Sequence, residues 1–379
     1  MRGPTDQAAP SAGAHGALPG HTASPLDLAD LRERVRIVVD AFIAEQAVIL
    51  GSVSPALEPL VDAISSLLAG GKRLRPAFCY WGWRGAIGEA GAEQDAAAVR
   101  AAASLEFLQA CALIHDDVMD GSDTRRGQPA AHHRFANLHR GSQWLGSPEA
   151  FGTGAAILLG DLCLSWADQA LLTSGMPGTD LVRAKSVYDE MRTELMAGQY
   201  LDLLEQALGG GSVERAMAVI RYKSAKYTIE RPLHLGAALA GASEEITQAY
   251  TDYGLTLGEA FQLRDDVLGV FGDPQQTGKP AGDDLREGKR TLLIALATER
   301  ADERQSVILR THLGDPHLEA TGIDALRAVI RETGALAETE DRIAQRLTQA
   351  VASIEQAPIH PEAQGALVAL AHAAATRSR

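Results

Sequence analysis

The sequence predicts an all-α protein, a single large bundle of antiparallel helices around a central cavity. Long segments rich in Ala and Leu carry apolar residues at helical spacing from about residue 28 to the end of the chain. Segments of alternating apolar and polar residues, which would indicate strands, are almost missing. Because no repeat or linker divides residues 25–379, we expect them to form one domain.

The expected helices follow one another with short breaks between them. Ser-Pro pairs at 54–55 and 147–148 are typical of the capping residue and first position of a helix. The apolar spacing predicts helices at roughly 28–50, 55–69, 75–87, 94–120, 148–174, 179–207, 213–240, 244–270, 286–300, 303–312, 323–333, 336–354 and 360–377. Breaks at 69–76, 121–148 and 272–291 are long or rich in charge and glycine, and such loops are more often functional than idle.

The composition limits the classes of function. Apolar residues make up 46% of the 379, which is enough for a large core. Lys and Arg total 35 against 49 Asp and Glu, so the net charge is −14. Because phosphate backbones attract basic surfaces, this balance argues against nucleic acid as the main partner.

Features that direct a chain to a compartment are few. Residues 1–24 are rich in Ala, Gly and Pro without an apolar stretch, which predicts a disordered tail rather than a signal peptide. No continuous apolar run reaches membrane-spanning length, so we expect no transmembrane segment. The cysteines lack zinc spacing and are odd in number, which favours reduced thiols in the cytoplasm. They are Cys79, Cys111 and Cys163.

Residues 113–127, LIHDDVMDGSDTRRG, concentrate aspartates and then arginines. Asp116 and Asp120 are four residues apart, so a helix places them on one face with Asp117 beside them. Like charges so placed repel one another unless a cation lies among them. Mg²⁺ suits such a group because it takes one or two carboxylates and fills its other positions with water and phosphate. A solvated helix end remains the alternative for one cluster alone.

A second aspartate pair, Asp265 and Asp266, lies near the end of another long apolar helix, in FQLRDD at 261–266. Negative charge near a helix C-terminus is unfavourable, so this placement opposes local stability in both helices. Facing carboxylate clusters are a recurring way to build a metal site inside a helical bundle. Two clusters therefore favour a metal site over two solvated helix ends.

Together with GGKRLRP at 70–76, these clusters resemble the trans-polyprenyl diphosphate synthases, in particular geranylgeranyl diphosphate synthases, over roughly residues 30–300. The resemblance implies a cluster of three Mg²⁺ ions held mainly by Asp116, Asp120 and Asp265. Asp117 and Asp266 would support them. The second motif departs from the family's pattern, because its usual last aspartate is Gly269 here.

The resemblance also implies which side chains bind the two substrates, isopentenyl diphosphate and an allylic diphosphate. Those expected to hold the diphosphate of isopentenyl diphosphate are Lys72, Arg75, Gln109 and Arg126. Those expected near the allylic diphosphate are Arg125, Lys223, Lys279 and Lys289. Those expected to line the same cavity are Gln199, Asp202, Ser224 and Gln262. Asp123 is expected to orient the two arginines. Any one of these lysines could instead be a solvated surface residue, and Gln109 could simply be satisfied by a neighbour.

The reaction implied is head-to-tail condensation, with Lys223, Asp116 and Asp265 as the catalytic group. Catalysis would consist mostly of stabilising the leaving diphosphate and positioning the substrates. A homodimer is the family's habit. The rival interpretations are a class I terpene cyclase, against which Lys72, Arg75 and Arg126 argue, and a non-catalytic partner subunit.

The length of the product should depend on what blocks the cavity beneath the first cluster. Cys111 and Ala112, five and four residues before Asp116, are small, whereas family members that stop early often carry an aromatic residue there. Phe107 lies one turn below Cys111, and a turn rises 5.4 Å, about one isoprene unit. We therefore expect a C20 product, with shorter (C15) and longer (C25 and above) products as alternatives.

Overall fold

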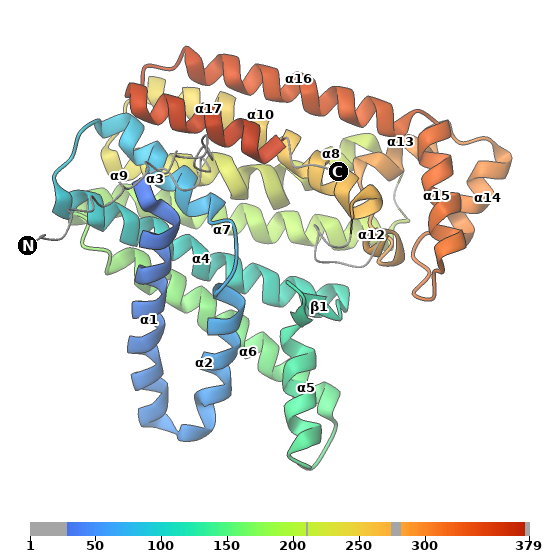
Figure 1. The fold of residues 1–379 in the computed structure, drawn as a ribbon, viewed down its shortest axis with the longest axis horizontal. Helices are drawn as coiled ribbons and strands as arrows, with labels where there is room; N and C mark the ends of the chain where they lie inside the picture. Colours follow the sequence, from blue (N-terminus) through green and yellow to red (C-terminus); the bar gives the residue numbers. More distant parts are fainter. Residues whose placement is uncertain (1–28, 210, 274–281, 376–379) are drawn as a thin grey trace, which may run out of the picture.

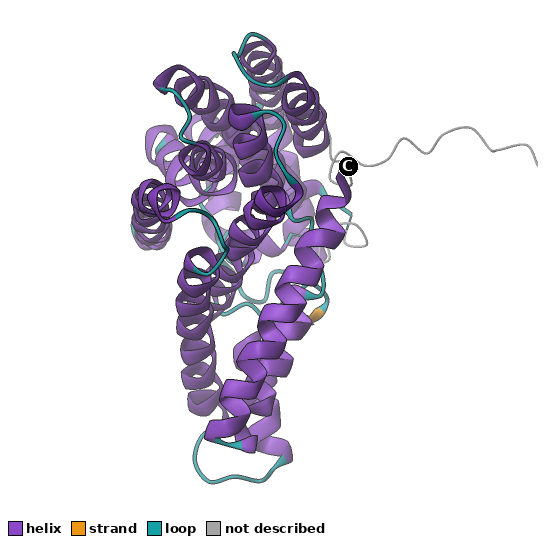
Figure 2. Cartoon of the chain, turned by 90° about the vertical axis from the view of Figure 1, so that its left-hand side faces the viewer, coloured by secondary structure: helices purple, strands orange, loops and turns teal. Residues whose placement is uncertain are grey.

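The computed structural model describes residues 29–209, 211–273 and 282–375. The expected N-terminal tail and Lys279 lie outside the described residues. The all-α prediction is confirmed, because the described strands are limited to the two-residue pair β1 (Thr124–Arg125) and β2 (Gln128–Pro129), which form a small hairpin. Figure 2 shows helices running through the whole of the molecule.

Most helix bounds match the expected ones within a few residues. The first half of the chain contains α1 (Leu31–Val53), a 3₁₀ turn η2 (Pro55–Leu57), α2 (Glu58–Leu68), α3 (Leu74–Ile87), α4 (Ala92–Asp120), α5 (Ala131–Gly141), α6 (Pro148–Leu172) and α7 (Gly178–Ala207). The second half contains α8 (Val213–Val219), η3 (Ile220–Glu230), α9 (Arg231–Ala240), α10 (Glu244–Phe271), α12 (Asp283–Arg286), α13 (Leu292–Arg300), α14 (Glu303–His312), α15 (Ala320–Glu332), α16 (Ala335–Glu355) and α17 (Pro361–Ala375).

The long helices α4, α7 and α10 form the middle of the molecule, and the segment η3 packs against both α7 and α10 (Figure 1). α3 packs on α9 and α4, α6 packs on α4, and α16 covers α10. α1 and α2 project from this body as a hairpin, with α5 beside them. The aspartate-bearing ends of α4 and α10 are thereby held within one layer of helices.

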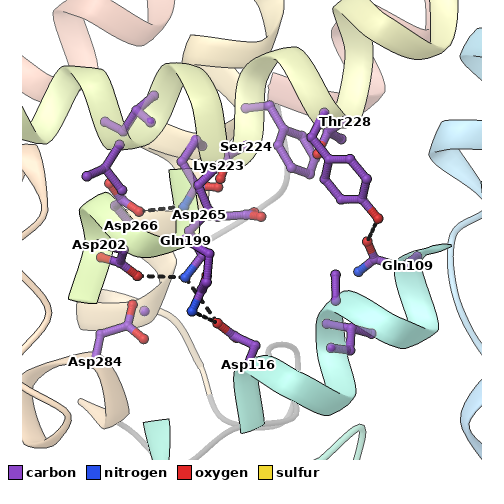
Figure 3. A pocket seen from close by; sticks show the side chains of 18 of the residues that line it. Gln109, Asp116, Gln199, Asp202, Lys223, Ser224, Thr228, Asp265, Asp266 and Asp284 are labelled. Carbon is purple, nitrogen blue, oxygen red and sulfur yellow. Dashed lines mark hydrogen bonds and ion pairs between the residues drawn. The ribbon is translucent and has the colours of Figure 1, made fainter. Parts of the chain in front are cut away.

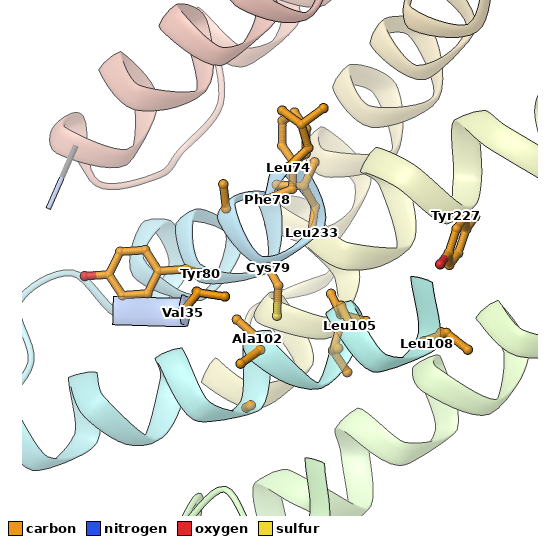
Figure 4. Packing of buried hydrophobic residues seen from close by; sticks show 14 of the residues in the cluster. Val35, Leu74, Phe78, Cys79, Tyr80, Ala102, Leu105, Leu108, Tyr227 and Leu233 are labelled. Carbon is orange, nitrogen blue, oxygen red and sulfur yellow. The ribbon is translucent and has the colours of Figure 1, made fainter. Parts of the chain in front are cut away.

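The main core forms where α3 meets α4, α9 and α1 (Figure 4). Phe78, Trp81 and Trp83 of α3 are buried, and Leu105 of α4 packs into the same cluster. α3 and α9 approach closely at Gly236, where an added Cβ would lie 2.1 Å from the carbonyl oxygen of Cys79 in α3. Burial of such large side chains stabilises the fold at about 25 cal/mol per Å² of apolar surface.

One expected loop is partly helical. Residues 121–148 were expected to be irregular, but they contain the β1–β2 hairpin and the eleven-residue helix α5. α5 buries Phe135, Ala136 and His139 on one face and packs against α6, where an added Cβ on Gly152 would lie 2.2 Å from the carbonyl oxygen of His132. Its many polar residues hid the helical spacing of these three positions.

The helix expected over 213–240 is interrupted. Residues of η3 have π-helical hydrogen bonding, and regular α-helix resumes at Arg231. π-helical turns occur often at functional sites because they change the direction of side chains relative to a regular helix. η3 carries Lys223, Ser224 and Tyr227, which line the central cavity of the molecule.

By length and composition alone, two helices among the described residues are apolar enough to span a membrane, α4 and α6. In α4, 78% of the most apolar window is buried inside the structure, as in the core helix of a water-soluble fold. In α6 the corresponding share is only 39%, and Ile157 and Leu158 are exposed. The exposed face of α6 therefore has no cover among the residues that the structure describes.

Candidate active site

A cavity of about 760 Å³ opens between α4, α7, η3 and α10, with the start of α3 at one end. Side chains from all of these elements point into it (Figure 3). The predicted residues that line it are Lys72, Arg75, Gln109, Ala112, Asp116, Arg125, Arg126, Gln199, Asp202, Lys223, Ser224, Gln262, Asp265, Asp266 and Lys289. Residues separated by more than 200 positions in the chain thus meet around one space.

Lys223 connects the first aspartate cluster to α7. Its ammonium group donates to Asp202 at 2.6 Å and to Asp116 at 3.1 Å, and Gln199 also donates to Asp116 at 3.1 Å. Although burial would lower the pKa of Lys223, Asp116 and Asp202 raise it, so the ammonium stays charged. A positive charge is therefore present among these carboxylates without any bound metal.

Gly198 allows α7 to approach η3 closely enough for these contacts. A Cβ at this position would lie 2.3 Å from the backbone nitrogen of Lys223, a distance that real Cβ atoms do not show. Gln199 and Asp202 follow on α7, one and four residues later, so the close approach carries both side chains to Lys223. The glycine thus explains the local geometry of this corner of the cavity.

Asp117 faces Arg125 rather than the open cavity. The guanidinium of Arg125 donates to Asp117 at 2.9 Å through Nε, and Asp117 is almost completely buried. Asp123 was expected to orient the arginines, but its side chain is 90% exposed and lies 3.1 Å from Nε2 of His133. The orienting carboxylate is therefore Asp117, because it lies inside the helix end while Asp123 lies beyond it.

Asp120 is buried beneath Lys289. The ammonium group of Lys289 lies 3.7 Å from Asp120, 3.6 Å from Asp284 and 2.9 Å from Glu287. Neither carboxylate oxygen of Asp120 has a hydrogen-bond partner, although both are shielded from solvent. Buried polar atoms are normally satisfied, so this carboxylate is poised for a ligand.

The second cluster contains a carboxylate that the sequence did not indicate. Gln262 donates to Asp266 at 2.8 Å, one turn further along α10. An added Cβ on Gly269 would lie 1.8 Å from Oδ2 of Asp284. The carboxyl group of Asp284, from α12, therefore occupies the space of the side chain that is missing at 269. Spacing alone could not reveal this, because the two positions are fifteen residues apart across a break in the helices.

The carboxylates of the two clusters differ widely in pKa. Burial would raise the pKa of Asp116, but Lys223, Lys289 and Arg125 lower it to about 2. Burial and the charge of Asp116 raise the pKa of Asp120 to about 6. Burial raises the pKa of Asp266 to about 8, against the opposing hydrogen bond from Gln262. Without a metal, Asp266 is thus mostly protonated at neutral pH.

The opposite end of the cavity is basic. Arg75 donates to Oγ1 of Thr228 at 2.8 Å, and its guanidinium lies 4.2 Å from the ring centroid of Tyr227. Tyr227 in turn donates to Oε1 of Gln109 at 2.8 Å. Arg126 donates to the carbonyl of Gly70 at 2.7 Å. Burial and the neighbouring arginines lower the pKa of Arg126, which means that its positive charge is disfavoured here. A bound anion would therefore be stabilised at this end of the cavity.

One turn below Cys111 on α4, aromatic residues pack around Phe107. Phe107 is fully buried, and its ring centroid lies 4.8 Å from that of Phe42 and 6.3 Å from that of Trp166. Cys111 is also buried, with Sγ 3.8 Å from Nδ1 of His115. Of the three residues expected to set product length, Ala112 lines the cavity, whereas Phe107 and Cys111 lie behind its lining. Phe42 and Trp166 were not indicated by the sequence, because they come from α1 and α6.

Comparison with known proteins identifies this arrangement. The family described as Polyprenyl synthetase matches residues 58–330. The chain belongs to the polyprenyl synthetase family. It is therefore a magnesium-dependent prenyltransferase, as members of this family are.

Individual relatives of this polyprenyl synthetase family member differ in product. The geranylfarnesyl diphosphate synthase of Aeropyrum pernix is 36% identical over 277 residues, covering 72% of this chain and 80% of the relative. The octaprenyl diphosphate synthase of Escherichia coli (strain K12) is 33% identical over 318 residues, covering 82% and 87%. A geranylgeranyl pyrophosphate synthase of Corynebacterium glutamicum, solved with isoprenyl diphosphate and magnesium, is 42% identical with a TM-score of 0.90, covering 93% and 100%.

The donors of this polyprenyl synthetase site fit Mg²⁺. Among the described residues, no three carboxylates or imidazoles converge tightly enough to hold a metal by themselves. Mg²⁺ does not need this, because it takes few protein ligands and keeps water and substrate phosphate. The unsatisfied oxygens of Asp120 and the unsatisfied Oδ2 of Asp266 are suitable hard donors. The lysines among the carboxylates show where positive charge is favourable.

Stability of the metal-free enzyme should fall as pH rises. Asp120 and Asp266 have pKa values of about 6 and about 8 in the folded state, above the value of 3.8 for an unperturbed Asp. The folded state therefore binds more protons than the unfolded state between about pH 4 and pH 8, and its free energy of unfolding falls as pH rises through this range. We expect the Tm to decrease from pH 5 to pH 8.5 in EDTA, and Mg²⁺ with inorganic diphosphate to raise it more at pH 8.5 than at pH 5. Asp116, whose pKa is about 2, does not titrate in this window. Scanning calorimetry measures both trends, and a Tm in EDTA that rises with pH would contradict the assignment.

Proposed function

We propose that the chain condenses isopentenyl diphosphate head-to-tail with an allylic diphosphate and releases a trans-polyprenyl diphosphate, with geranylgeranyl diphosphate (C20) as the main product. The observation that carries this proposal is the meeting of two aspartate clusters and a basic end around one cavity. A terpene cyclase would need the aspartates but not the basic end, because it binds no second diphosphate.

The residues divide into three groups in the proposed mechanism. Three Mg²⁺ ions would be held by Asp116, Asp120, Asp265 and Asp266, with Asp284 in the place of the missing last aspartate. When bound, Mg²⁺ would neutralise the developing charge of the leaving diphosphate. The side chains proposed to hold the allylic diphosphate are Arg125, Lys223, Lys279 and Lys289. Calorimetric titration of Mg²⁺ with inorganic diphosphate into the wild type and into Asp284→Asn tests the assignment of Asp284. The variant should bind Mg²⁺ and diphosphate more weakly, and equal affinities in the two proteins would reject the assignment.

The basic end would hold the second substrate. Lys72 and Arg75 supply a point charge and a planar two-donor group, which together suit a diphosphate. Gln109 and Arg126 complete that subsite. The reacting carbons would then lie between Gln109 and Asp116, two turns apart on α4. Positioning of this kind accelerates a two-substrate reaction without a general base in the protein.

An assay with purified protein tests the reaction. With Mg²⁺, isopentenyl diphosphate and farnesyl diphosphate, we expect release of inorganic diphosphate and a C20 prenyl diphosphate, detected by mass spectrometry. EDTA should abolish both. Absence of product with geranyl, farnesyl and dimethylallyl primers would reject the proposal. A cyclic hydrocarbon formed from one prenyl diphosphate alone would instead support a cyclase.

Product length should change when the aromatic wall is opened. Removing the ring of Phe107 opens space toward Phe42 and Trp166, so Phe107→Ala should lengthen the main product by about one C5 unit. Chromatography of the dephosphorylated products measures this. Phe78→Ala, which removes an equally buried ring in α3, should lower the Tm without changing product length. An unchanged product in Phe107→Ala would show that Phe107 is not the floor.

We also propose that the enzyme is a homodimer joined through α6 and α7. Leu158 on α6 is 67% exposed and Tyr200 on α7 is 66% exposed. A groove of about 660 Å³ is lined by residues of the same two helices, with Leu164 and Met196 as its apolar members. A two-fold axis would place each patch against its copy, which suits a self-complementary surface. Light scattering should give twice the 40.1 kDa chain mass. Leu158→Asp should reduce the measured mass to that of one chain. Val307→Asp, at an exposed apolar residue of α14, is the control and should leave the mass unchanged. A monomeric wild type would reject the proposal.

We place the enzyme in the cytoplasm. All three cysteines are free and buried, and burial raises the pKa of Cys111 to about 12, so its thiol is unreactive. Isoprenyl diphosphates are charged, water-soluble substrates. Fractionation of the source cells should recover the activity with the soluble proteins, and recovery in a secreted fraction would reject this location.

A further inference from the structure

The loop between α2 and α3 contains an arginine that the proposed function does not use. Arg73 follows Lys72 directly and has φ +54°, in the left-handed region that residues other than glycine rarely adopt. Its side chain is only 4% exposed. A buried charge and an unfavourable backbone conformation coincide at one residue, and such coincidences cluster at functional sites.

The partners of Arg73 explain how this conformation is maintained. Its guanidinium pairs with the carboxylate of Glu106 on α4, whose side chain is 5% exposed, and also donates to the carbonyl of Leu68 at the end of α2. Because both charges are buried, removing either one would leave the other without its ion-pair partner, which is costly. The pair therefore ties the loop to α4 and α2 at once.

The same part of α4 also contacts the network around Arg75, the second residue of α3. Gln109 lies three residues after Glu106 and accepts the hydrogen bond of Tyr227, whose ring packs against Arg75. Thus Glu106 sets the position of Arg73, and Gln109 sets that of Arg75 through Tyr227. Lys72 and Arg75 lie on either side of Arg73, so the rigid α4 helix determines where these two cations stand.

Glu106 also adjusts the charge at this end of the cavity. The pKa of Arg126 is lowered by burial and by Arg73, Arg125 and Arg75, whereas Glu106 opposes this shift. Glu106 thus neutralises Arg73, while Lys72, Arg75 and Arg126 also line this end of the cavity. The arrangement offers a diphosphate a defined set of donors instead of a diffuse cluster of positive charge.

We propose that the Arg73–Glu106 pair positions the subsite for isopentenyl diphosphate, acting through Lys72 and Arg75 without holding the substrate itself. The inference rests on the proposed function, because it concerns the second substrate of that reaction. It predicts a selective effect: loss of the pair should impair this substrate and leave the allylic substrate, held by Arg125 and the lysines near α10, largely unaffected.

Steady-state kinetics with each substrate varied in turn tests the proposal. Arg73→Met and Glu106→Gln should each raise the KM for isopentenyl diphosphate at least tenfold, with the allylic KM within twofold and kcat within threefold of wild type. The double variant should have a KM for isopentenyl diphosphate no higher than the larger of the two single-variant values, because each single substitution already breaks the same ion pair. Arg73→Lys keeps the positive charge but loses the second donor of the guanidinium, so it should raise the KM for isopentenyl diphosphate less than Arg73→Met does. This variant replaces Arg73→Met in the test if Arg73→Met does not fold.

The control is Glu259→Gln in α10, which removes another buried carboxylate, paired with Arg221 at 3.0 Å and Arg346 at 2.6 Å. It should lower the Tm while both KM values stay within twofold. If the Arg73 and Glu106 variants behave like this control, the pair is merely structural and the proposal is overturned. Equal rises in both KM values would also overturn it. A wild type that makes no prenyl product would reject the proposed function as well, whereas active variants with unchanged KM values reject this inference alone.

Discussion

Asp116→Asn should lower kcat by about 10³-fold while leaving the fold intact. Asp116 faces the cavity, accepts hydrogen bonds from Lys223 and Gln199, and is ionised at every physiological pH because its pKa is about 2. An amide keeps the shape but removes the charge that would hold Mg²⁺. Loss of one well-placed electrostatic contact to a leaving group costs about 10²–10³-fold, and loss of a metal ligand should be at the upper limit.

Single-turnover kinetics with farnesyl diphosphate measures the effect, and circular dichroism checks the fold. The matched control is Asp123→Asn, seven residues along the chain in the same aspartate-rich segment. Because the Asp123 side chain is 90% exposed and pairs with the partly exposed His133, its variant should retain activity within twofold. Comparable losses in both variants would mean that the first cluster acts through its total charge and not through the geometry described.

Gly198→Ala should destabilise the protein and inactivate it together. The added Cβ would lie 2.3 Å from the backbone nitrogen of Lys223, and backbone cannot move aside as a flexible side chain could. Overpacking of this kind costs about 1–3 kcal/mol. Because α7 would have to move away from η3, Gln199 and Asp202 would lose their contacts with Asp116 and Lys223. We expect kcat to fall by about 10²-fold, since displacements near 1 Å can have that effect.

Gly51→Ala provides the comparison for this glycine. Gly51 lies in α1, and an added Cβ there meets nothing within 4 Å. Alanine should stabilise that helix by about 0.5–1 kcal/mol because it restricts the unfolded chain. Thermal melts and kcat of both variants, measured side by side, separate steric conflict from helix propensity. A Gly198→Ala enzyme that keeps full activity would show that α7 tolerates displacement from η3.

The helices and both aspartate clusters could be predicted from the sequence, because helical spacing and i, i+4 carboxylates are local patterns. The basic end could be predicted only through resemblance, since Lys72 and Arg126 come together by tertiary packing. α5 was missed because its polar composition obscured three buried positions. The π-helical hydrogen bonding of η3 has no sequence signal in a segment that also fits a regular helix.

Three aspartates show what spacing cannot predict. The role of Asp123 was wrong, the contact of Asp117 with Arg125 was not foreseen and Asp284 was missed, because these features depend on depth and on neighbours. Asp117 is buried against Arg125, Asp123 is exposed, and Asp284 reaches Gly269 from another helix. A pattern of charges along the chain carries no information about which of them solvent can reach.

Lys223 and Lys289 balance part of the negative charge of the carboxylates around them. Their ammonium groups lie among the carboxylates of Asp116, Asp202, Asp120 and Asp284, as monovalent counter-ions attached to the protein. In the proposed reaction Asp116 and Asp120 would hold Mg²⁺ instead, and the two ammonium groups would turn to the diphosphate of the substrate. Each lysine would thereby exchange one anionic partner for another, so that neither ammonium group loses its counter-charge when the substrate binds.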